Sequence, residues 1–96
     1  MTPRQRFGQF LATARRKAGL TQSDVARALG YDFENAQQLA SNWERGMALP
    51  PRAKAPQLAE VLGIPRGRYL EAWREYVDAS AREHWKAMRA EFEERA

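Results

Sequence analysis

The chain has 96 residues, with 16 Lys and Arg, 12 Asp and Glu, no cysteine and a formal net charge of +4. This size predicts one modest domain, and the missing thiols exclude disulfides and zinc–thiolate sites. No apolar run approaches the roughly 18 residues that a membrane-spanning helix needs, and the first residues lack the apolar segment of a signal peptide. We therefore expect a protein of the reducing cytoplasm that contacts no membrane.

The positive charge is concentrated in the first half of the chain. Residues 1–55 hold nine Lys and Arg against four Asp and Glu, a balance of +5. Residues 56–96 hold seven against eight, a balance of −1. A surface for an anionic partner is therefore expected in the first half.

The first predicted helix has clear signals at both ends. Thr2 can cap it, with Pro3 at its first position and Gln5 completing a capping box. Its apolar residues recur at helical spacing and form one stripe: Phe7, Phe10, Leu11, Ala14 and Ala18. Gly19 is predicted to end it, because glycine adopts the left-handed conformation at little cost.

A second, shorter helix is predicted directly afterwards. Thr21 can cap it, and Asp24 three residues later predicts another capping box. Its buried stripe is Val25, Ala26 and Leu29. Gly30 is predicted to end this helix.

The start of the third predicted helix is less sharply marked, because either Asp32 or Asn35 could cap it. On a helical wheel of about 100° per residue, polar and apolar side chains separate cleanly. The polar side holds Asn35, Gln37, Gln38, Ser41, Asn42 and Arg45, and the apolar side holds Phe33, Ala36, Leu39, Ala40 and Trp43. Such a helix would bury its tryptophan, leave its amides facing outward and end at Gly46.

The second half of the chain predicts two further helices. The fourth is expected to start near Ala53 and to end at Gly63, burying Leu58, Val61 and Leu62. Pro65 can open a fifth helix that runs almost to the last residue. Its apolar positions repeat every eleven residues, which gives a nearly straight seam. Since no segment shows the alternation typical of a strand, the expected fold is all-α.

The polar side of the third helix suggests a binding chemistry. An amide offers a donor beside an acceptor, which matches N6 and N7 of adenine in the DNA major groove. We therefore expect base contacts, with A·T pairs in the bound site, from Asn35, Gln37, Gln38, Ser41 and Asn42. Phosphate contacts are expected from Arg16, Lys17, Arg45, Arg52 and Lys54. The plainer alternative is a solvated helix face with solubilising charges.

Four separate blocks within residues 11–64 carry a family resemblance. They are Gly19-Leu20-Thr21-Gln22, Val25-Ala26 with Leu29-Gly30, Trp43-Glu44-Arg45-Gly46, and Leu58-Ala59 with Leu62-Gly63-Ile64. In register and spacing the chain resembles the phage-repressor/Cro-type helix-turn-helix proteins, also called XRE-like. The resemblance implies a lambda-repressor-like fold with a helix-turn-helix DNA-binding domain at residues 1–64. The expected chain thus has five helices, of which the fifth, an extended C-terminal helix at residues 65–96, lies outside the resemblance and is expected to be a dimerisation element.

The same resemblance implies roles for single residues. Gln22 corresponds to a glutamine that binds a phosphate and braces the recognition helix. Gln37 and Gln38 correspond to residues that read bases, and Asn42 to one that reaches a base edge or a phosphate. A structural salt bridge between the first and third helices is implied for one pair, Arg15 and Glu44.

The C-terminal seam is too apolar to leave in water along a lone helix. It holds Leu70, Trp73, Val77, Ala81, His84, Trp85, Met88 and Phe92. Either this helix folds back onto the domain or it pairs with the same helix of a second copy. We expect pairing, because residues beyond about Ser80 cannot all reach so small a body. A dimer would also place two recognition helices one helical turn, about 34 Å, apart.

These features predict a sequence-specific transcriptional regulator. The preferred form of this hypothesis is an autoregulatory repressor. It would bind an inverted repeat in double-stranded DNA as a homodimer and occlude a promoter. It would be cytoplasmic, and on the nucleoid when bound. The alternative from another class is an antitoxin or other interaction module whose C-terminal helix binds a partner protein. A controller of restriction–modification or anti-CRISPR genes would share the DNA-binding mechanism.

Neither an enzyme site nor a metal or cofactor site is predicted. His84 is the only histidine and has no second ligand at metal spacing. Ser23 and Asp24 supply, with that histidine, the residue types of a hydrolase triad, but helix capping explains them and no nucleophile elbow is present. The glycines end helices and form no phosphate-binding loop.

Overall fold

The computed structural model describes residues 1–77 and 82–94, except for the side chains of residues 82–87. Its helices are α1 (Pro3–Lys17), α2 (Gln22–Ala28), α3 (Gln37–Glu44), α4 (Ala55–Val61), α5 (Arg66–Tyr76) and α6 (Arg82–Glu94), with a 3-10 turn η1 (Arg52–Lys54) before α4. The described residues contain no strand, so the all-α prediction is confirmed. In the same ranges, no helix combines the length and apolar character that crossing a membrane requires.

The first two helices begin at the predicted capping boxes. The Thr2 hydroxyl accepts from the Gln5 backbone N–H at 3.1 Å, and the Gln5 side-chain oxygen accepts from the Thr2 N–H at 2.7 Å. Thr21 and Asp24 exchange the equivalent bonds at 3.0 and 2.8 Å. Each pair satisfies two backbone donors that the helix itself cannot use.

The start of α3 differs from both sequence alternatives. Its N-cap is Ala36, which has no side-chain capping bond, so neither Asp32 nor Asn35 caps the helix. Asn35 instead takes a left-handed conformation with φ 65°, which asparagine tolerates better than most residues. Phe33, expected on the apolar side, precedes the helix and is 57% exposed.

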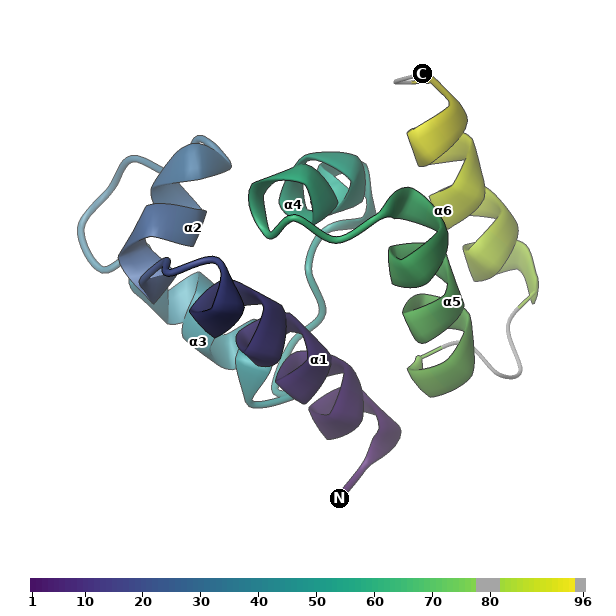
Figure 1. Cartoon of the computed structure of the whole chain (residues 1–96), viewed down its shortest axis with the longest axis horizontal. Coiled ribbons are helices and arrows are strands. Elements are labelled where there is room, and N and C mark those ends of the chain that lie inside the picture. The colour runs from purple at the N-terminus through teal and green to yellow at the C-terminus, as the bar shows by residue number, and fades with distance from the viewer. Residues whose placement is uncertain (78–81, 95–96) are drawn as a thin grey trace.

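The helices α1, α2 and α3 form one packed unit (Figure 1). α3 lies against both α1 and α2, and its Ala40 and Trp43 are buried. Gly8 allows the close approach of α1 to α3, because a Cβ at this position would lie within 3.0 Å of the Trp43 and Glu44 carbonyl groups. The end of α3 is therefore fixed by direct backbone contact with α1.

An aromatic cluster joins α1 to the C-terminal half. The Phe7 ring makes edge-to-face contacts with Tyr69 at 5.6 Å and with Trp73 at 5.4 Å between ring centres. Burial raises the pKa of Tyr69. Its hydroxyl and the Trp73 Nε1 are buried without a hydrogen-bond partner in the described part of the chain. The core is thus continuous from α1 into α5.

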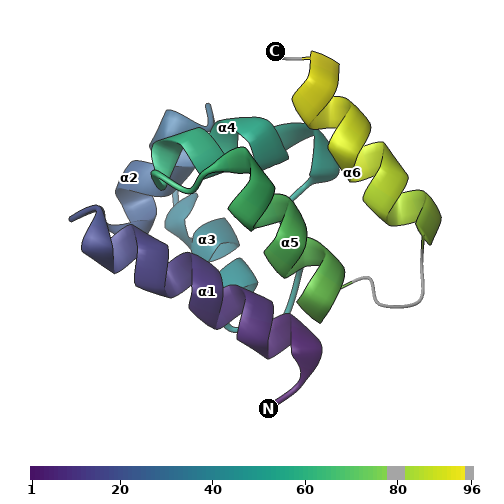
Figure 2. The same ribbon diagram turned by 45° about the vertical axis from the view of Figure 1, so that its right-hand side comes forward.

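The expected single C-terminal helix is two helices. α5 ends at Tyr76, and α6 lies beside α5 and also contacts α4 and η1 (Figures 1 and 2). The physical reason is burial: Met88 and Phe92 of α6 are 0% and 3% exposed within one copy of the chain, and the Phe92 ring centre lies 5.7 Å from that of Tyr69. A straight helix would have left these side chains in water.

This packing uses part of the expected dimer seam within one copy of the chain. Trp73, Met88 and Phe92 are buried inside that copy, so in this arrangement they are not available to a second copy. Leu70 and Val77 are half-buried against the same core. The remaining seam positions, Ala81, His84 and Trp85, lie outside the described side chains. α6 therefore folds back onto the domain, which was the first of the two alternatives.

Candidate nucleic-acid interface

One face of α3 is polar and open to solvent. Gln37 and Gln38 are exposed in its first turn, and Ser41 and Asn42 are half-exposed one turn later. The opposite side holds Trp43, of which only 4% is exposed. This division follows the helical period of the sequence and keeps the amides on the outside.

Two of the amides on this face are hydrogen-bonded to each other. The Gln38 amide donates to Asn42 Oδ1 at 3.0 Å, and the Arg45 guanidinium donates to the same oxygen at 3.2 Å. All three groups are near the surface and are linked at i,i+3 and i,i+4 spacing. The chain of bonds holds them in one orientation, and exposed bonds of this kind exchange readily for bonds to another partner.

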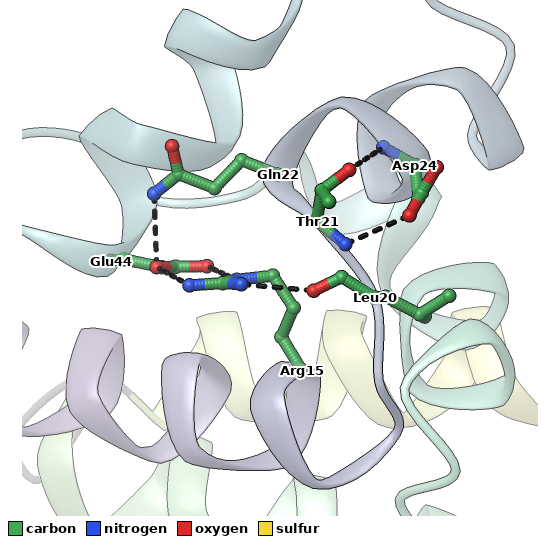
Figure 3. A network of polar contacts seen from close by, with 6 residues as sticks. All are labelled: Arg15, Leu20, Thr21, Gln22, Asp24 and Glu44. Atoms are coloured by element: carbon green, nitrogen blue, oxygen red, sulfur yellow. Dashed lines mark hydrogen bonds and ion pairs between the residues drawn. The ribbon is translucent and has the colours of Figure 1, made fainter.

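A partly buried ion pair anchors the inner side of α3 (Figure 3). Arg15 of α1 donates to both oxygens of Glu44, from Nε at 2.6 Å and from Nη2 at 3.1 Å. The two side chains are only 14% and 11% exposed. A third guanidinium bond, to the Leu20 carbonyl at 2.9 Å, ties in the turn between α1 and α2. The Glu44 hydrogen bond raises the pKa of Arg15, so this residue stays charged.

Gln22, the first residue of α2, joins the same network. Its Nε2 donates to Glu44 Oε1 at 3.1 Å, so the glutamine braces the inner side of α3 (Figure 3). An amide nitrogen carries two donors, which leaves one for another acceptor. Nearby, hydrogen bonds from Thr21 lower the pKa of Asp24 and keep its carboxylate ionised as the capping partner.

The basic residues predicted around this face fall into two groups. Arg16, Arg45 and Arg52 are exposed. Lys54 is half-buried, and its Nζ donates to the Leu29 carbonyl at 2.9 Å and lies 5.4 Å from the centre of the Tyr31 ring. Lys54 thereby holds the end of α2, which is a structural role that the sequence did not indicate.

Lys17 also lies away from the α3 face. It follows Gly8 by nine residues, which at about 100° per residue places it on the opposite side of α1 from the contact with α3. Arg16 is not on that opposite side. Two different observations therefore weaken the expected phosphate contacts. Lys17 points away from α3, and the ammonium group of Lys54 is already bonded to the Leu29 carbonyl.

A small polar hollow next to the start of α3 adds residues that the sequence analysis missed. Its volume is about 130 Å³, and its lining includes Ser23 and Arg27 of α2 together with Gln37. Arg27 is exposed and lies in the last turn of α2. Its place beside α3 depends on how the two helices pack, which no local sequence signal gives.

Residues 6–73 match a protein-family model described as a helix-turn-helix domain. The chain belongs to the helix-turn-helix domain family. The match runs from α1 into α5 and therefore includes the whole α2–α3 unit with its polar face. No curated protein and no solved structure matches the chain. Helix-turn-helix domains bind DNA through the second helix of this unit, which here is α3.

Proposed function

We propose that this helix-turn-helix protein is a sequence-specific transcriptional regulator that inserts α3 into the DNA major groove. The observation that carries the proposal is the solvent-facing row of amides on a helix whose other side is fixed by Trp43 and by the Arg15–Glu44 pair. A helix that contacts bases must hold its side chains in a fixed position, and rigid packing on its other side provides this.

Base contacts in this proposal come from the polar face of α3. Gln37 and Gln38 enter first, with Ser41 and Asn42 one turn further on and Asn35 just before the helix. Each amide that pairs bidentately with adenine is worth about 1–3 kcal/mol of discrimination against another base. The internal bonds of Gln38 and Asn42 would exchange for bonds to the bases.

Phosphate contacts in this proposal surround that face. Gln22 has one amide donor left, and Arg16, Arg45 and Arg52 are exposed cations. Arg27 joins them because it lies beside Gln37. Lys17 and Lys54 are not part of the proposed DNA surface. Such contacts set the register on the duplex and make the affinity fall steeply with salt.

The finer proposal is an autoregulatory repressor of the phage-repressor type that binds an inverted repeat as a homodimer and occludes a promoter. The spacing of its four sequence blocks supports this type. Two copies would place their α3 helices about 34 Å apart on one face of the duplex. Since the apolar residues described on α6 are used inside the chain, the contact between copies would form elsewhere or only on DNA.

Selection of bound DNA from a random pool tests the proposal, followed by anisotropy titration of the winning duplex at two salt concentrations. We expect a preferred half-site that contains A·T pairs, repeated in inverted orientation, with two copies of the protein per duplex. Uniform weak binding without a preferred sequence would overturn sequence-specific recognition. A preferred single half-site with one bound copy would overturn the homodimer alone.

A partner-binding function through the C-terminal helix is the alternative candidate, and it loses its original support. It required the apolar side of that helix to be free, whereas Met88 and Phe92 are buried within the chain and the Phe92 ring packs against Tyr69 of α5. An interaction with another protein is better supported at a different surface, which lies between α1 and α5.

A further inference from the structure

An open groove runs between α1 and the turn from α4 to α5. Its volume is about 960 Å³. Its apolar lining is formed mainly by Phe10, Ala14, Ala18, Leu62, Ile64 and Pro65. An apolar hollow of this size in so small a domain is large enough to receive a ligand or a partner's side chains.

The charges around the groove are of one sign. Arg6 and Lys17 of α1 and Arg68 of α5 line it, and no acidic residue is among the described residues that do. The Arg68 guanidinium lies 5.3 Å from the centre of the Phe10 ring, and Arg68 also meets Glu71 at 3.4 Å in an exposed pair. The groove therefore suits an occupant that is apolar along one side and negative along its edges.

The shape favours an elongated occupant. Arg6 and Lys17 are eleven residues apart on one helix, which corresponds to a rise of about 16 Å. A small carboxylate or phosphate would need polar groups that converge on one point, whereas these cations are spread along the groove. Three turns of a partner helix would cover the same length and place their apolar residues at i, i+3, i+4 and i+7.

A second copy of this chain does not fit the groove. A two-fold contact would bring the same three cations face to face across the interface, and like charges repel. The copy's own α6 is also unsuitable, because the large apolar side chains described on it, Met88 and Phe92, are buried in its own core.

The groove and the DNA-reading helix lie on opposite sides of α1. Measured around α1 from Gly8, which contacts α3, the groove residues Arg6, Phe10 and Lys17 are about 160–200° away. An occupant of the groove would therefore leave α3 free to enter a major groove.

We propose that this groove is a docking site for an acidic amphipathic helix of another protein, and that it can be filled while α3 is bound to DNA. The docking step itself does not depend on the proposed DNA function. It requires only the apolar lining and the basic rim.

Titration of the 96-residue chain with labelled synthetic helical peptides tests the proposal. The acidic probe carries leucines at i, i+3, i+4 and i+7 and glutamates elsewhere, and its counterpart carries lysines in place of the glutamates. By fluorescence anisotropy we expect the acidic peptide to bind at least ten-fold more tightly. Arg6→Glu should weaken it at least five-fold, whereas Arg4→Glu, which is exposed on the other side of α1, should change it less than two-fold.

Three results would overturn the proposal. The first is equal affinity for the two peptides or equal effects of the two arginine variants. The second is saturable binding of dodecanoate without binding of the acidic peptide, which would make the groove a site for a small amphiphile. The third is a dimer mass in solution that Lys17→Glu abolishes, which would assign the groove to a second copy. The claim of simultaneous binding fails separately if saturating peptide lowers the affinity for DNA more than two-fold.

Discussion

At the residue scale, Glu44 connects three helices of the candidate interface. It receives hydrogen bonds from Arg15 of α1 and from Gln22 of α2, and it belongs to α3. Because the pair is largely buried, removing one partner leaves an uncompensated charge inside the fold. Glu44 therefore fixes the position of α3 from its inner side, away from the face proposed to contact DNA.

Glu44→Gln should lower the free energy of unfolding by about 3 kcal/mol, because Arg15 would keep its buried charge without a counter-ion. Urea unfolding followed by circular dichroism measures this. The double variant Arg15→Met with Glu44→Leu should recover most of the loss, since both charges are then gone. Equal stability of wild type and Glu44→Gln would contradict a structural role for the pair.

Asp24 gives a pH-dependent prediction. Hydrogen bonds from Thr21 lower its pKa in the folded protein below the ordinary value of 3.8, so the ionised carboxylate favours the fold. This contribution is complete above the ordinary value and is lost as the pH falls through the folded pKa. The stability difference between wild type and Asp24→Asn should therefore be largest near neutral pH and shrink below about pH 4. A difference that stays constant with pH would argue against the capping bond.

At the element scale, the placement of α3 depends on how closely α1 approaches it. Gly8 lies on the carbonyl groups of Trp43 and Glu44, where no side chain can be fitted without moving backbone. α1 thus fixes the position of α3, the proposed DNA-reading helix.

Gly8→Ala should destabilise the fold by about 1–3 kcal/mol, the usual cost of overpacking, and should weaken DNA binding because α3 is displaced. Thermal unfolding and anisotropy measure the two effects. Gly67→Ala is the matched control. Its added methyl group would meet no atom within 4 Å in the first turn of α5, so a gain of about 0.5–1 kcal/mol is expected. Similar effects of the two variants would show that the α1–α3 contact is not tight.

The helix boundaries differ in how far the sequence predicts them. α1 and α2 begin at residues that satisfy their own backbone donors, so their starts are set by a few neighbouring residues. α3 has no such cap, and its start depends on packing against α1 and α2, which local patterns do not encode. The polar face of α3 was nevertheless predictable, because the period of buried residues determines which side faces solvent.

Long-range contacts of single side chains were not predictable. The bond from Lys54 to the Leu29 carbonyl joins positions 25 residues apart, and nothing near either residue indicates it. The Arg15–Glu44 pair is similarly distant in sequence, and only the family resemblance suggested it. Charge type alone therefore does not separate a phosphate contact from a structural lysine.

At the scale of the whole molecule, the C-terminal segment completes the core instead of leaving it. The eleven-residue apolar repeat fits a straight helix paired with a second copy and also two helices packed on one domain. The repeat shows which side of the C-terminal segment is apolar, but it does not show which part of the molecule covers that side. The structure buries Met88 and Phe92 of α6, which lies against α4 and α5, so this described part of the apolar side is covered within one chain.

Phe92→Ala should lower stability by about 3–5 kcal/mol, because the ring is 3% exposed and packs against Tyr69. Glu94→Ala, at an exposed position of the same helix, should change stability by less than about 0.5 kcal/mol. Thermal unfolding followed by circular dichroism measures both effects. A Phe92→Ala variant that is as stable as wild type but no longer forms a dimer in solution would restore the dimer seam at this helix.

The proposed reading of DNA by the amides of α3 is tested most directly by comparing the sequences selected from a random pool by wild type, Gln37→Ala, Gln38→Ala and Gln9→Ala. Gln9 is an exposed glutamine on α1 and serves as the control. We predict that each α3 variant loses preference at one or two A·T positions of the half-site, while Gln9→Ala selects the same half-site as wild type. Identical half-sites from all four proteins would contradict base reading by this face.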